Sequence, residues 1–468
     1  MTTIIKIITA LVLGLISQFV EAQEITGVWS GVLKTPGSDV PIEVSIEKNN
    51  NEYAAVLKSP SQSNRDIPVD KVRFENQFLT LEVNAMMVTY KGKLENQVFK
   101  GTFTQGGNSI SLDLTEGKAV VEKSKRRSQD PVKPYPYISE DVVFLNKKAN
   151  SIKLSGTLTL PKNIEKPPVV ILISGSGPQN RNEELLNHRP FLVLSDHLTL
   201  QGIAVLRYDE RGVGESEGQY SGATSFDFST DVEAAIEFLK KREDIDIKKI
   251  GLIGHSEGGL IAPMVASNNA DVAFVVSLAG TGVIGKKVLI SQAKRALELL
   301  GASKEYIEVD GETRNIIFSA VQQESSKEAI VARSKEGLKK YSGTLNEEKK
   351  TIFLTLPLDQ LISVFSESVW MQYFVRTDPD QFLSKVRVPV LAINGSKDSQ
   401  VLPELNLSGF KKGLEKAGNK DYTVKEIEGL NHLFQTADTG AGTEYETIEE
   451  TFNPEAMKLV SDWILKRF

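Results

Sequence analysis

The sequence contains no cysteine and only four histidines among its 468 residues. The absence of cysteine excludes disulfides, a thiolate nucleophile and metal sites built on thiolates. Basic residues are not in excess, since 55 Lys and Arg stand against 61 Asp and Glu. No overall positive field therefore exists to gather phosphates, and we expect no nucleic-acid partner.

Long apolar runs are also scarce, and the amino terminus holds the one of interest. Lys6 precedes the apolar stretch Ile7–Leu15, and Val20-Glu21-Ala22 has the small residues that suit signal peptidase. The stretch is shorter than the about 20 residues that span a bilayer. We therefore expect residues 1–22 to be a cleaved signal peptide, and the mature chain to be periplasmic or secreted without a membrane span.

The segment after the signal has a strand-like pattern. From Ile25 to Leu114, short runs alternate apolar and polar residues and are separated by turn residues such as Pro36-Gly37. This period of two indicates antiparallel strands. We expect residues 23–118 to form a small all-β accessory domain, a barrel or a sandwich. Charge and proline dominate residues 119–136, which we interpret as a solvated linker.

The remaining two thirds of the chain have a different pattern. Continuous apolar runs such as Val169–Ile173 and Ile250–Ile253 suit strands that are buried on both faces. Helical segments separate these runs, so residues 137–468 are predicted to form a mostly parallel α/β sheet with helices on both faces. Helical periodicity without strand signals extends over about residues 281–385, which predicts a helical lid inserted above the sheet.

The strongest local motif is Gly254-His255-Ser256-Glu257-Gly258. A Gly-x-Ser-x-Gly sequence between a strand and a helix forms a sharp turn that exposes the serine hydroxyl. This context predicts Ser256 as a nucleophile. His255 is adjacent to the serine and lies on the wrong side of such a turn to act as its base. We expect it to pack or hydrogen-bond beneath the turn.

A serine nucleophile requires a base, and the base requires a carboxylate. His432 is the only histidine after Ser256 and follows the last predicted strand, so it is the predicted base. Asp398 follows the preceding predicted strand, at the carboxyl edge of the sheet, where α/β proteins carry their functional residues. It is therefore the predicted carboxylate. Glu428 and Asp421 are weaker candidates because one is too close to His432 and the other precedes the last strand.

A loop of small residues, Ser174-Gly175-Ser176-Gly177-Pro178, follows the strand Val169–Ile173. Such a loop predicts an oxyanion hole, in which one donor is the N–H of Glu257 and the other the N–H of Ser176, with Gly177 as second choice. A nucleotide-binding loop is disfavoured because Pro178 replaces the lysine that phosphates require.

Other polar residues are interpreted as structural. These are His188 and His197, and the charged segment Tyr208–Ser216, whose Arg211 suits a bidentate carboxylate contact. In the predicted lid, the aromatic residues Trp370, Tyr373 and Phe374 are candidates for lining a substrate pocket and equally for the core of the lid.

Several longer motifs together resemble one family. Residues 137–468 resemble the α/β-hydrolase superfamily, and within it bacterial serine esterases of the EstD type. The resemblance rests on the loop at 174–178 and on Gln179-Asn180-Arg181-Asn182-Glu183, His188-Arg189-Pro190-Phe191, Leu206–Gly214, Gly254–Gly259 and Asn394-Gly395-Ser396-Lys397-Asp398. It implies a triad of Ser256, Asp398 and His432, no cofactor or metal, and hydrolysis of small carboxylic esters with short acyl chains. Asn180 and Asn182 depart from the pattern, since relatives often have aspartates there.

The sequence therefore predicts an α/β-hydrolase fold with a helical lid, preceded by a small all-β domain, and a serine carboxylesterase activity. Two alternatives remain open. One is a serine peptidase of the prolyl-oligopeptidase kind, although about 90 residues of β pattern are too few for the propeller of that class. The other is a binding protein without enzymatic activity on a hydrolase fold. The sequence leaves the oligomeric state undetermined.

Overall fold

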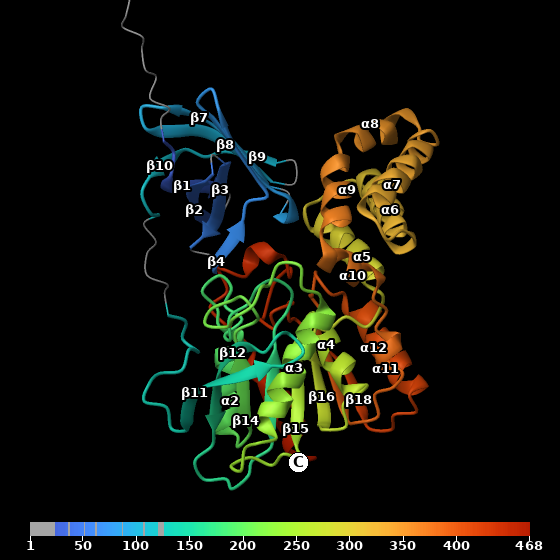
Figure 1. The fold of residues 1–468 in the computed structure, drawn as a ribbon. Helices are drawn as coiled ribbons and strands as arrows, with labels where there is room; N and C mark the ends of the chain where they lie inside the picture. The colour runs from blue at the N-terminus through green and yellow to red at the C-terminus, as the bar shows by residue number, and fades with distance from the viewer. Residues whose placement is uncertain are drawn as a thin grey trace, which may run out of the picture.

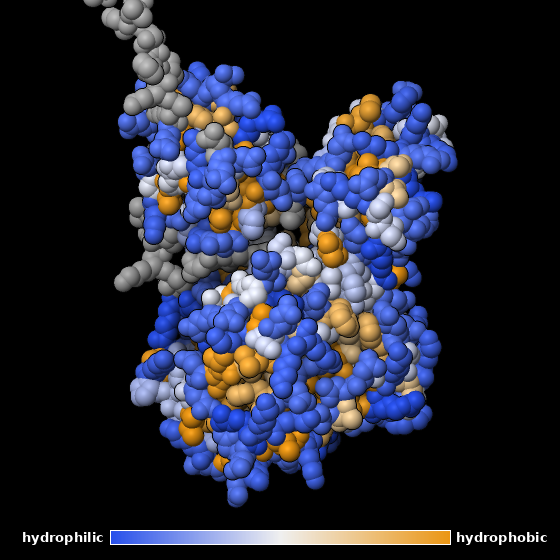
Figure 2. Space-filling view, in the orientation of Figure 1, coloured by the Kyte–Doolittle hydropathy of each residue, from blue (hydrophilic) through white to orange (hydrophobic). Residues whose placement is uncertain are grey.

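The computed structural model describes residues 24–35, 38–50, 52–60, 63–86, 88–105, 108–119 and 126–468. The expected signal peptide lies outside these residues. No helix of the described chain is long and apolar enough to cross a membrane. An all-β body and a helical body both lie over one end of a larger α/β body (Figure 1). In the space-filling view the surface between the two upper bodies is hollowed (Figure 2).

The all-β body is one strongly curled antiparallel sheet in the order β4-β3-β2-β1-β10-β8-β7-β6-β5, with β9 paired to β8. Strand β3 contacts β5, which stands at the far end of this order, so the two ends of the sheet come together. Inward residues of the alternating pattern, including Trp29, Tyr90 and Phe99, form its core. The described elements are β1 (Gly27–Thr35), β2 (Ser38–Asn49), β3 (Glu52–Ser59), β4 (Ser63–Pro68), β5 (Lys71–Glu75), β6 (Phe78–Val83), η1 (Asn84–Met86), β7 (Val88–Glu95), β8 (Val98–Gln105), β9 (Asn108–Ser111) and β10 (Leu114–Glu116).

The α/β body contains a second sheet in the order β11-β12-β14-β13-β15-β16-β17-β18. β11 and β12 pair antiparallel, and β12 pairs antiparallel with β14, while the strands from β14 to β18 are parallel. The predicted parallel α/β sheet is thus confirmed. Its strands are β11 (Ile138–Asn146), β12 (Ile152–Leu160), β13 (Val169–Ile173), β14 (Ala204–Tyr208), β15 (Ile250–His255), β16 (Val272–Leu278), β17 (Val390–Gly395) and β18 (Tyr422–Ile427).

Helices cover both faces of this sheet because its strands are apolar on both sides. Ile171 of β13 faces the cluster that contains α3 and α4, whereas Leu172 faces the cluster that contains α2 and α13. The parallel strands direct their carboxyl ends to one edge, where loops carry the candidate site residues. The covering helices are α2 (Pro190–Leu200), α3 (Ser225–Leu239), α4 (Gly258–Ala266), α12 (Pro403–Lys416) and α13 (Pro454–Leu465).

A helical insertion separates β16 from β17, and most of it forms the upper right body of Figure 1. It has its own apolar core, which includes Phe318 and Phe365. Helix α9 contacts η1 of the all-β body. The insertion comprises α5 (Gly285–Leu299), α6 (Lys304–Gln323), α7 (Lys327–Ser342), α8 (Glu347–Thr355), α9 (Leu358–Glu367), α10 (Val369–Arg376) and α11 (Asp380–Leu383).

The interpretation of residues 119–136 as a solvated linker is wrong around Arg127 and Asp130, which are buried, whereas residues 132–134 are exposed as expected. Arg127 is only 8% exposed, and its guanidinium donates to the carbonyl oxygens of Leu186, Glu446 and Ile448 at 2.7–3.3 Å. Asp130 pairs with Arg189 at 2.7 Å. The charged composition predicted solvation, but here the charges dock the segment onto the α/β body. Residues 120–125 lie outside the described residues.

Candidate active site

The turn at Ser256 has the strained geometry that its motif predicts. Ser256 has a φ of 52°, in the left-handed region that side chains rarely adopt. Gly254 and Gly258 are required for close approach, because a Cβ at Gly254 would collide with the carbonyl of Gly258, and one at Gly258 with the carbonyl of Ile173. Ser256 is partly exposed while both of its neighbours in the chain are buried. Strain that is retained at an exposed serine is a feature of functional sites.

Asp398 and His432 are directly hydrogen-bonded. Asp398 Oδ2 lies 2.8 Å from His432 Nδ1, and the two residues are 2% and 4% exposed. The other carboxylate oxygen accepts the backbone N–H groups of Gln400 and Val401, both at 2.8 Å. The carboxylate is therefore held so that it accepts Nδ1–H of the neutral imidazole. This tautomer leaves Nε2 of His432 free to take a proton.

The loop that carries His432 is attached to the serine turn through His255. His255 Nε2 lies 2.9 Å from the backbone carbonyl of His432, and the two imidazole rings are 4.8 Å apart at their centroids. Asn431 shapes the loop internally, because its side-chain oxygen accepts the N–H groups of Leu433 and Gln435, each at 3.0 Å. The structure thus brings Ser256, Asp398 and His432 to one edge of the sheet.

Side-chain acceptors bind two of the N–H groups of the small-residue loop. The Gly175 N–H donates to Glu183 Oε1 at 2.7 Å, and the Gly177 N–H donates to the Tyr220 hydroxyl at 2.9 Å. Gly177 is therefore not available as the second oxyanion donor, which corrects its place among the candidates.

The other end of the same loop is held by a second carboxylate. Glu210 accepts the Gln179 N–H at 2.9 Å and the Ser174 hydroxyl at 2.8 Å. Burial raises the pKa of Glu210 well above its usual range, although these two hydrogen bonds act to lower it. Pro178 has no N–H to donate. Between Gly175 and Gln179, all described residues, the N–H of Ser176 is therefore the one for which the structure gives no acceptor.

Glu257 combines a backbone donor with a buried side chain. Its N–H stands at the amino end of α4 next to Ser256. Its carboxylate is buried and accepts hydrogen bonds from the Ser225 hydroxyl at 2.5 Å and from Trp370 Nε1 at 2.8 Å. Burial raises the pKa of Glu257 to about 7, although both hydrogen bonds act to lower it. The side chain therefore links the serine turn to the helical insertion.

The three predicted pocket aromatics occupy the base of the insertion. Trp370 stacks on Phe374 with ring centroids 5.3 Å apart, and Phe374 is packed among apolar residues that include Leu260 and Met264 of α4. Tyr373 is partly buried against the same group. Trp370 is thus the one that reaches the residue after Ser256, while Phe374 contributes to a packed core.

The residues interpreted as structural are in structural positions. His188 lies within 2.9 Å of Thr451 Oγ1 and 2.8 Å of the Tyr445 carbonyl. His197 lies 3.0 Å from Ser461 Oγ. As predicted, Arg211 makes a bidentate contact with a carboxylate, that of Asp231, at 2.7 and 2.9 Å.

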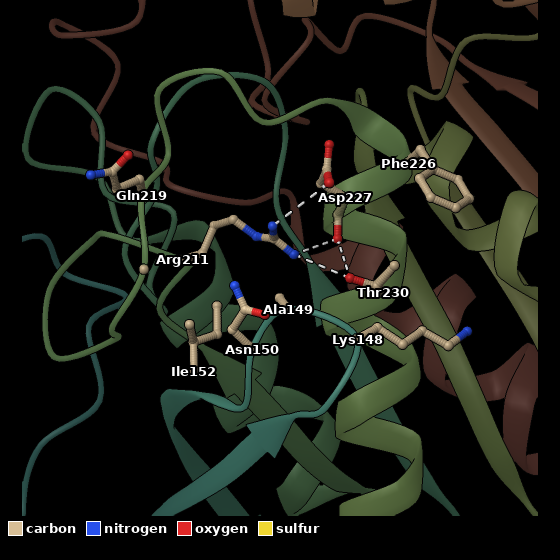
Figure 3. Close-up of a pocket in the computed structure, with 10 residues that line it drawn as sticks. Lys148, Ala149, Asn150, Ile152, Arg211, Gln219, Phe226, Asp227 and Thr230 are labelled. Atoms are coloured by element: carbon tan, nitrogen blue, oxygen red, sulfur yellow. Dashed lines mark hydrogen bonds and ion pairs between the residues drawn. The ribbon is translucent and has the colours of Figure 1, made fainter.

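Arg211 also lines a cavity of about 430 Å³ between a turn after β11 and α3 (Figure 3). In this view its guanidinium points toward Asp227 and Thr230, to which it is joined by an ion pair and a hydrogen bond. None of the candidate catalytic residues lines this cavity. We therefore assign Arg211 to the local framework.

Sequence reasoning did not identify the acceptors that hold the small-residue loop, the candidate oxyanion loop at residues 174–178. Glu183, Glu210 and Tyr220 come from three separate segments, and only the fold brings them to the loop. Glu183 and Glu210 do stand in the motifs that carry the family resemblance, so the signal was present. Glu183 holds the loop from a left-handed backbone conformation, with a φ of 51°. No local sequence pattern predicts that conformation.

This chain is similar to a known family and to several known proteins. Residues 190–350 match the family model described as serine aminopeptidase, S33. The chain is 23% identical over 383 residues to the esterase EstD of Thermotoga maritima, which covers 80% of each protein. Solved structures similar to this one include Est1E from Butyrivibrio proteoclasticus (22% identity, 68% of this chain, 95% of that chain, TM-score 0.39) and the Pyrococcus furiosus esterase Pf2001 (18% identity, 74% and 99%, TM-score 0.41).

Proposed function

We propose that this member of the α/β-hydrolase superfamily, which is similar to the esterase EstD, is a serine carboxylesterase that acts on small esters with short acyl chains. The observation that carries the proposal is the buried hydrogen bond of 2.8 Å between Asp398 and His432, beside the strained turn at Ser256. Because this hydrogen bond fixes the tautomer of His432, the remaining ring nitrogen can act as a general base.

In the proposed reaction, Ser256 Oγ attacks the ester carbonyl while His432 Nε2 takes its proton. The carbonyl π electrons move to the oxygen, and the N–H groups of Ser176 and Glu257 stabilise the negative charge. The C–O bond to the alcohol then breaks as the imidazolium returns the proton to the leaving oxygen. Water, deprotonated by His432, attacks the acyl enzyme in the same way and releases the carboxylic acid.

The helical insertion is proposed to act as a lid over this reaction. It lies above the carboxyl ends of the strands, on the same side as the site (Figure 1). Trp370 connects it to Glu257 within 2.8 Å. We propose that Trp370 and Tyr373, which are only partly buried, border the acyl group and exclude long acyl chains, while Phe374 supports them from the packed core.

Hydrolysis of p-nitrophenyl acetate, butyrate, octanoate and laurate by the wild-type chain and by Ser256→Ala tests this proposal. We expect the shortest acyl chains to be cleaved most efficiently and the variant to retain less than about 10⁻³ of wild-type kcat. Ester hydrolysis that survives in Ser256→Ala would contradict the serine mechanism.

A peptidase is a second candidate, because the matched family model is described as a serine aminopeptidase. The same triad would attack an amide carbonyl. Comparison of an aryl acetate with aminoacyl and aminoacyl-proline arylamides separates the two activities. Faster cleavage of an arylamide would replace the esterase assignment, and failure to cleave either class would favour a binding protein on this fold.

We also propose export of the protein, on the strength of residues 1–22 alone. Expression of the full chain in a bacterium, followed by fractionation and determination of the mature amino terminus, tests this. Cleavage before Gln23 with recovery outside the cytoplasm is the expected result, and an uncleaved cytoplasmic protein contradicts it.

A further inference from the structure

Glu183 and His255 form a buried pair directly behind the serine turn. Glu183 Oε1 lies 2.8 Å from His255 Nδ1, and the residues are 5% and 7% exposed. A crevice beside the pair is otherwise lined by the apolar side chains of Pro190, Phe191, Leu433 and Phe452. The pair is therefore buried with apolar neighbours on this side.

Both ring nitrogens of His255 face oxygen atoms. Nδ1 faces the Glu183 carboxyl group, while Nε2 lies 2.9 Å from the backbone carbonyl of His432. A carbonyl oxygen only accepts, so Nε2 must carry a proton. Glu183 Oε1 also accepts the Gly175 N–H at 2.7 Å, which is a role for a carboxylate rather than for the hydroxyl of a carboxylic acid. A proton on Nδ1 satisfies every one of these contacts, which makes the ring an imidazolium.

The charges at the site are consistent with this protonation state. The carboxylate of Glu183 raises the pKa of His255 above its ordinary value, in spite of the burial that acts to lower it. Hydrogen bonding to the His432 carbonyl and the charge of Asp398 act in the same direction.

The pair joins the three parts that an acyl transfer reaction must hold together. Glu183 binds the oxyanion loop at Gly175, and His255 binds the loop of the general base at His432. At Gly175 a Cβ would lie 3.1 Å from Ser256 Cβ and 3.5 Å from His255 Nδ1, so the pair, the loop and the nucleophile meet at one point. A buried ion pair contributes little to stability, but it can specify a unique arrangement.

We infer that Glu183 and His255 form a buried ion pair that positions the oxyanion loop and the loop of His432 around Ser256. The inference rests on the proposed function, because it assigns two positioning residues to the proposed reaction. Neither residue exchanges a proton with the substrate. Their effect is on geometry, so their loss lowers kcat more than it changes KM.

The ring nitrogens of His255 provide a direct test, because the chain has only four histidines. A proton–nitrogen correlation spectrum of the full-length protein with ¹⁵N-labelled imidazole rings, recorded at pH 7, is expected to show His255 with both nitrogens protonated. His255→Asn assigns the signals, and if that variant does not fold, substitution of the other three histidines does so by elimination. A His255 ring with one proton overturns the inference without recourse to any further variant.

Kinetics test the positioning role separately. Glu183→Gln keeps one oxygen acceptor and the size of the side chain but removes the charge, and we expect kcat to fall about 10²-fold with KM changed by less than about threefold. Glu183→Asp, which restores the charge, should recover part of kcat. His197→Gln is the control, since His197 contacts Ser461 and no residue of the site. Wild-type kcat in folded Glu183→Gln overturns the inference.

The proposed function itself is tested by different measurements, namely ester hydrolysis and the labelling of Ser256. If the wild-type chain neither hydrolyses esters nor reacts with an organophosphorus ester at Ser256, the proposed function fails. If Ser256 is reactive but the His255 ring carries one proton, only the ion pair fails.

Discussion

The indole N–H of Trp370, in the helical insertion, donates to the buried carboxylate of Glu257, the residue that follows Ser256, over 2.8 Å. The backbone N–H of Glu257 is the proposed oxyanion donor, so the same residue contacts the insertion through its side chain and serves the reaction through its main chain. Ser225 of α3 donates to the same oxygen at 2.5 Å. Glu257 therefore couples the position of α10 directly to the serine turn.

The raised pKa of Glu257 predicts a pH dependence of stability. This pKa is about 7 in the folded chain against 4.5 for the unperturbed group, so between these values the folded state holds a proton that the unfolded state releases. The free energy of unfolding then decreases as pH rises from about 4.5 to 7 and changes little from this source above 7. Urea unfolding at pH 5 and at pH 8 measures this difference in the free energy of unfolding.

In Glu257→Gln this contribution is absent. The difference in unfolding free energy between pH 5 and pH 8 should shrink by roughly 2 to 3 kcal/mol relative to wild type. Glu426→Gln, at an exposed glutamate of β18, is the matched control and should leave the difference unchanged. An equal pH dependence in wild type and Glu257→Gln would show that the folded carboxyl group titrates normally.

Trp370→Phe tests the link between the insertion and the turn. The substitution keeps an aromatic ring stacked on Phe374 but removes the hydrogen bond to Glu257, leaving a buried carboxylate with one donor fewer. We expect a loss of about 1 to 3 kcal/mol in the free energy of unfolding. Trp463→Phe is the comparison, because its indole donates to Thr423 away from the site. Equal stability of Trp370→Phe and wild type would contradict the assigned hydrogen bond.

Much of this architecture could be predicted from the sequence, because it depends on local pattern. The buried parallel strands followed from continuous apolar runs, and the turn at Ser256 followed from two glycines whose Cβ atoms have no space. The order of Asp398 and His432 behind two strand ends required only the rule for α/β sheets. These features need no knowledge of which distant segments meet.

Features that depend on long-range contacts were not predictable. The carbonyl oxygens that bind Arg127 belong to residues 59 to 321 positions away, so its charge was interpreted as a sign of solvation. In the same way, Gly177 was a candidate donor until Tyr220, 43 positions later, was found to accept its N–H. Burial of charged groups is set by partners that sequence composition does not reveal.

Removal of the Ser176 N–H tests the assignment of the second oxyanion donor. Ser176→Pro eliminates this N–H, whereas Ser176→Ala keeps it and removes only the hydroxyl. We expect Ser176→Pro to lose about 10²–10³ in kcat and Ser176→Ala to remain within about threefold of wild type. A similar loss in both variants would indicate that the hydroxyl, and not the N–H, is the important group.

Substitution of Asp398 tests which carboxylate orients His432. In Asp398→Asn the side-chain shape is kept but the tautomer of His432 is no longer enforced, and kcat is expected to fall about 10⁴-fold. Asp421→Asn is the matched control, since Asp421 pairs with Arg467 at 2.7 Å outside the site. A loss in Asp421→Asn as large as in Asp398→Asn would contradict the assignment.

The docked segment around Arg127 gives a prediction that is independent of catalysis. Arg127→Ala removes hydrogen bonds to three carbonyl oxygens, so the segment should detach more often from the α/β body. The Ser128 N–H, which donates to Glu449 Oε1 at 3.0 Å, is expected to exchange with solvent deuterium at least about tenfold faster. A tenfold change corresponds to about 1.4 kcal/mol. Arg333→Ala, at an exposed arginine of α7, serves as the control. Unchanged exchange of this N–H in Arg127→Ala would support a segment that is already detached.

The central claim is that Ser256 is the nucleophile of an acyl transfer reaction. Incubation of the wild-type chain with an aryl organophosphorus ester, followed by peptide mass spectrometry, tests it most directly. The account predicts one covalent adduct, on Ser256, formed in step with the loss of esterase activity and absent from Ser256→Ala. An unmodified Ser256 in a protein that still hydrolyses esters, or an adduct on another residue, would contradict it.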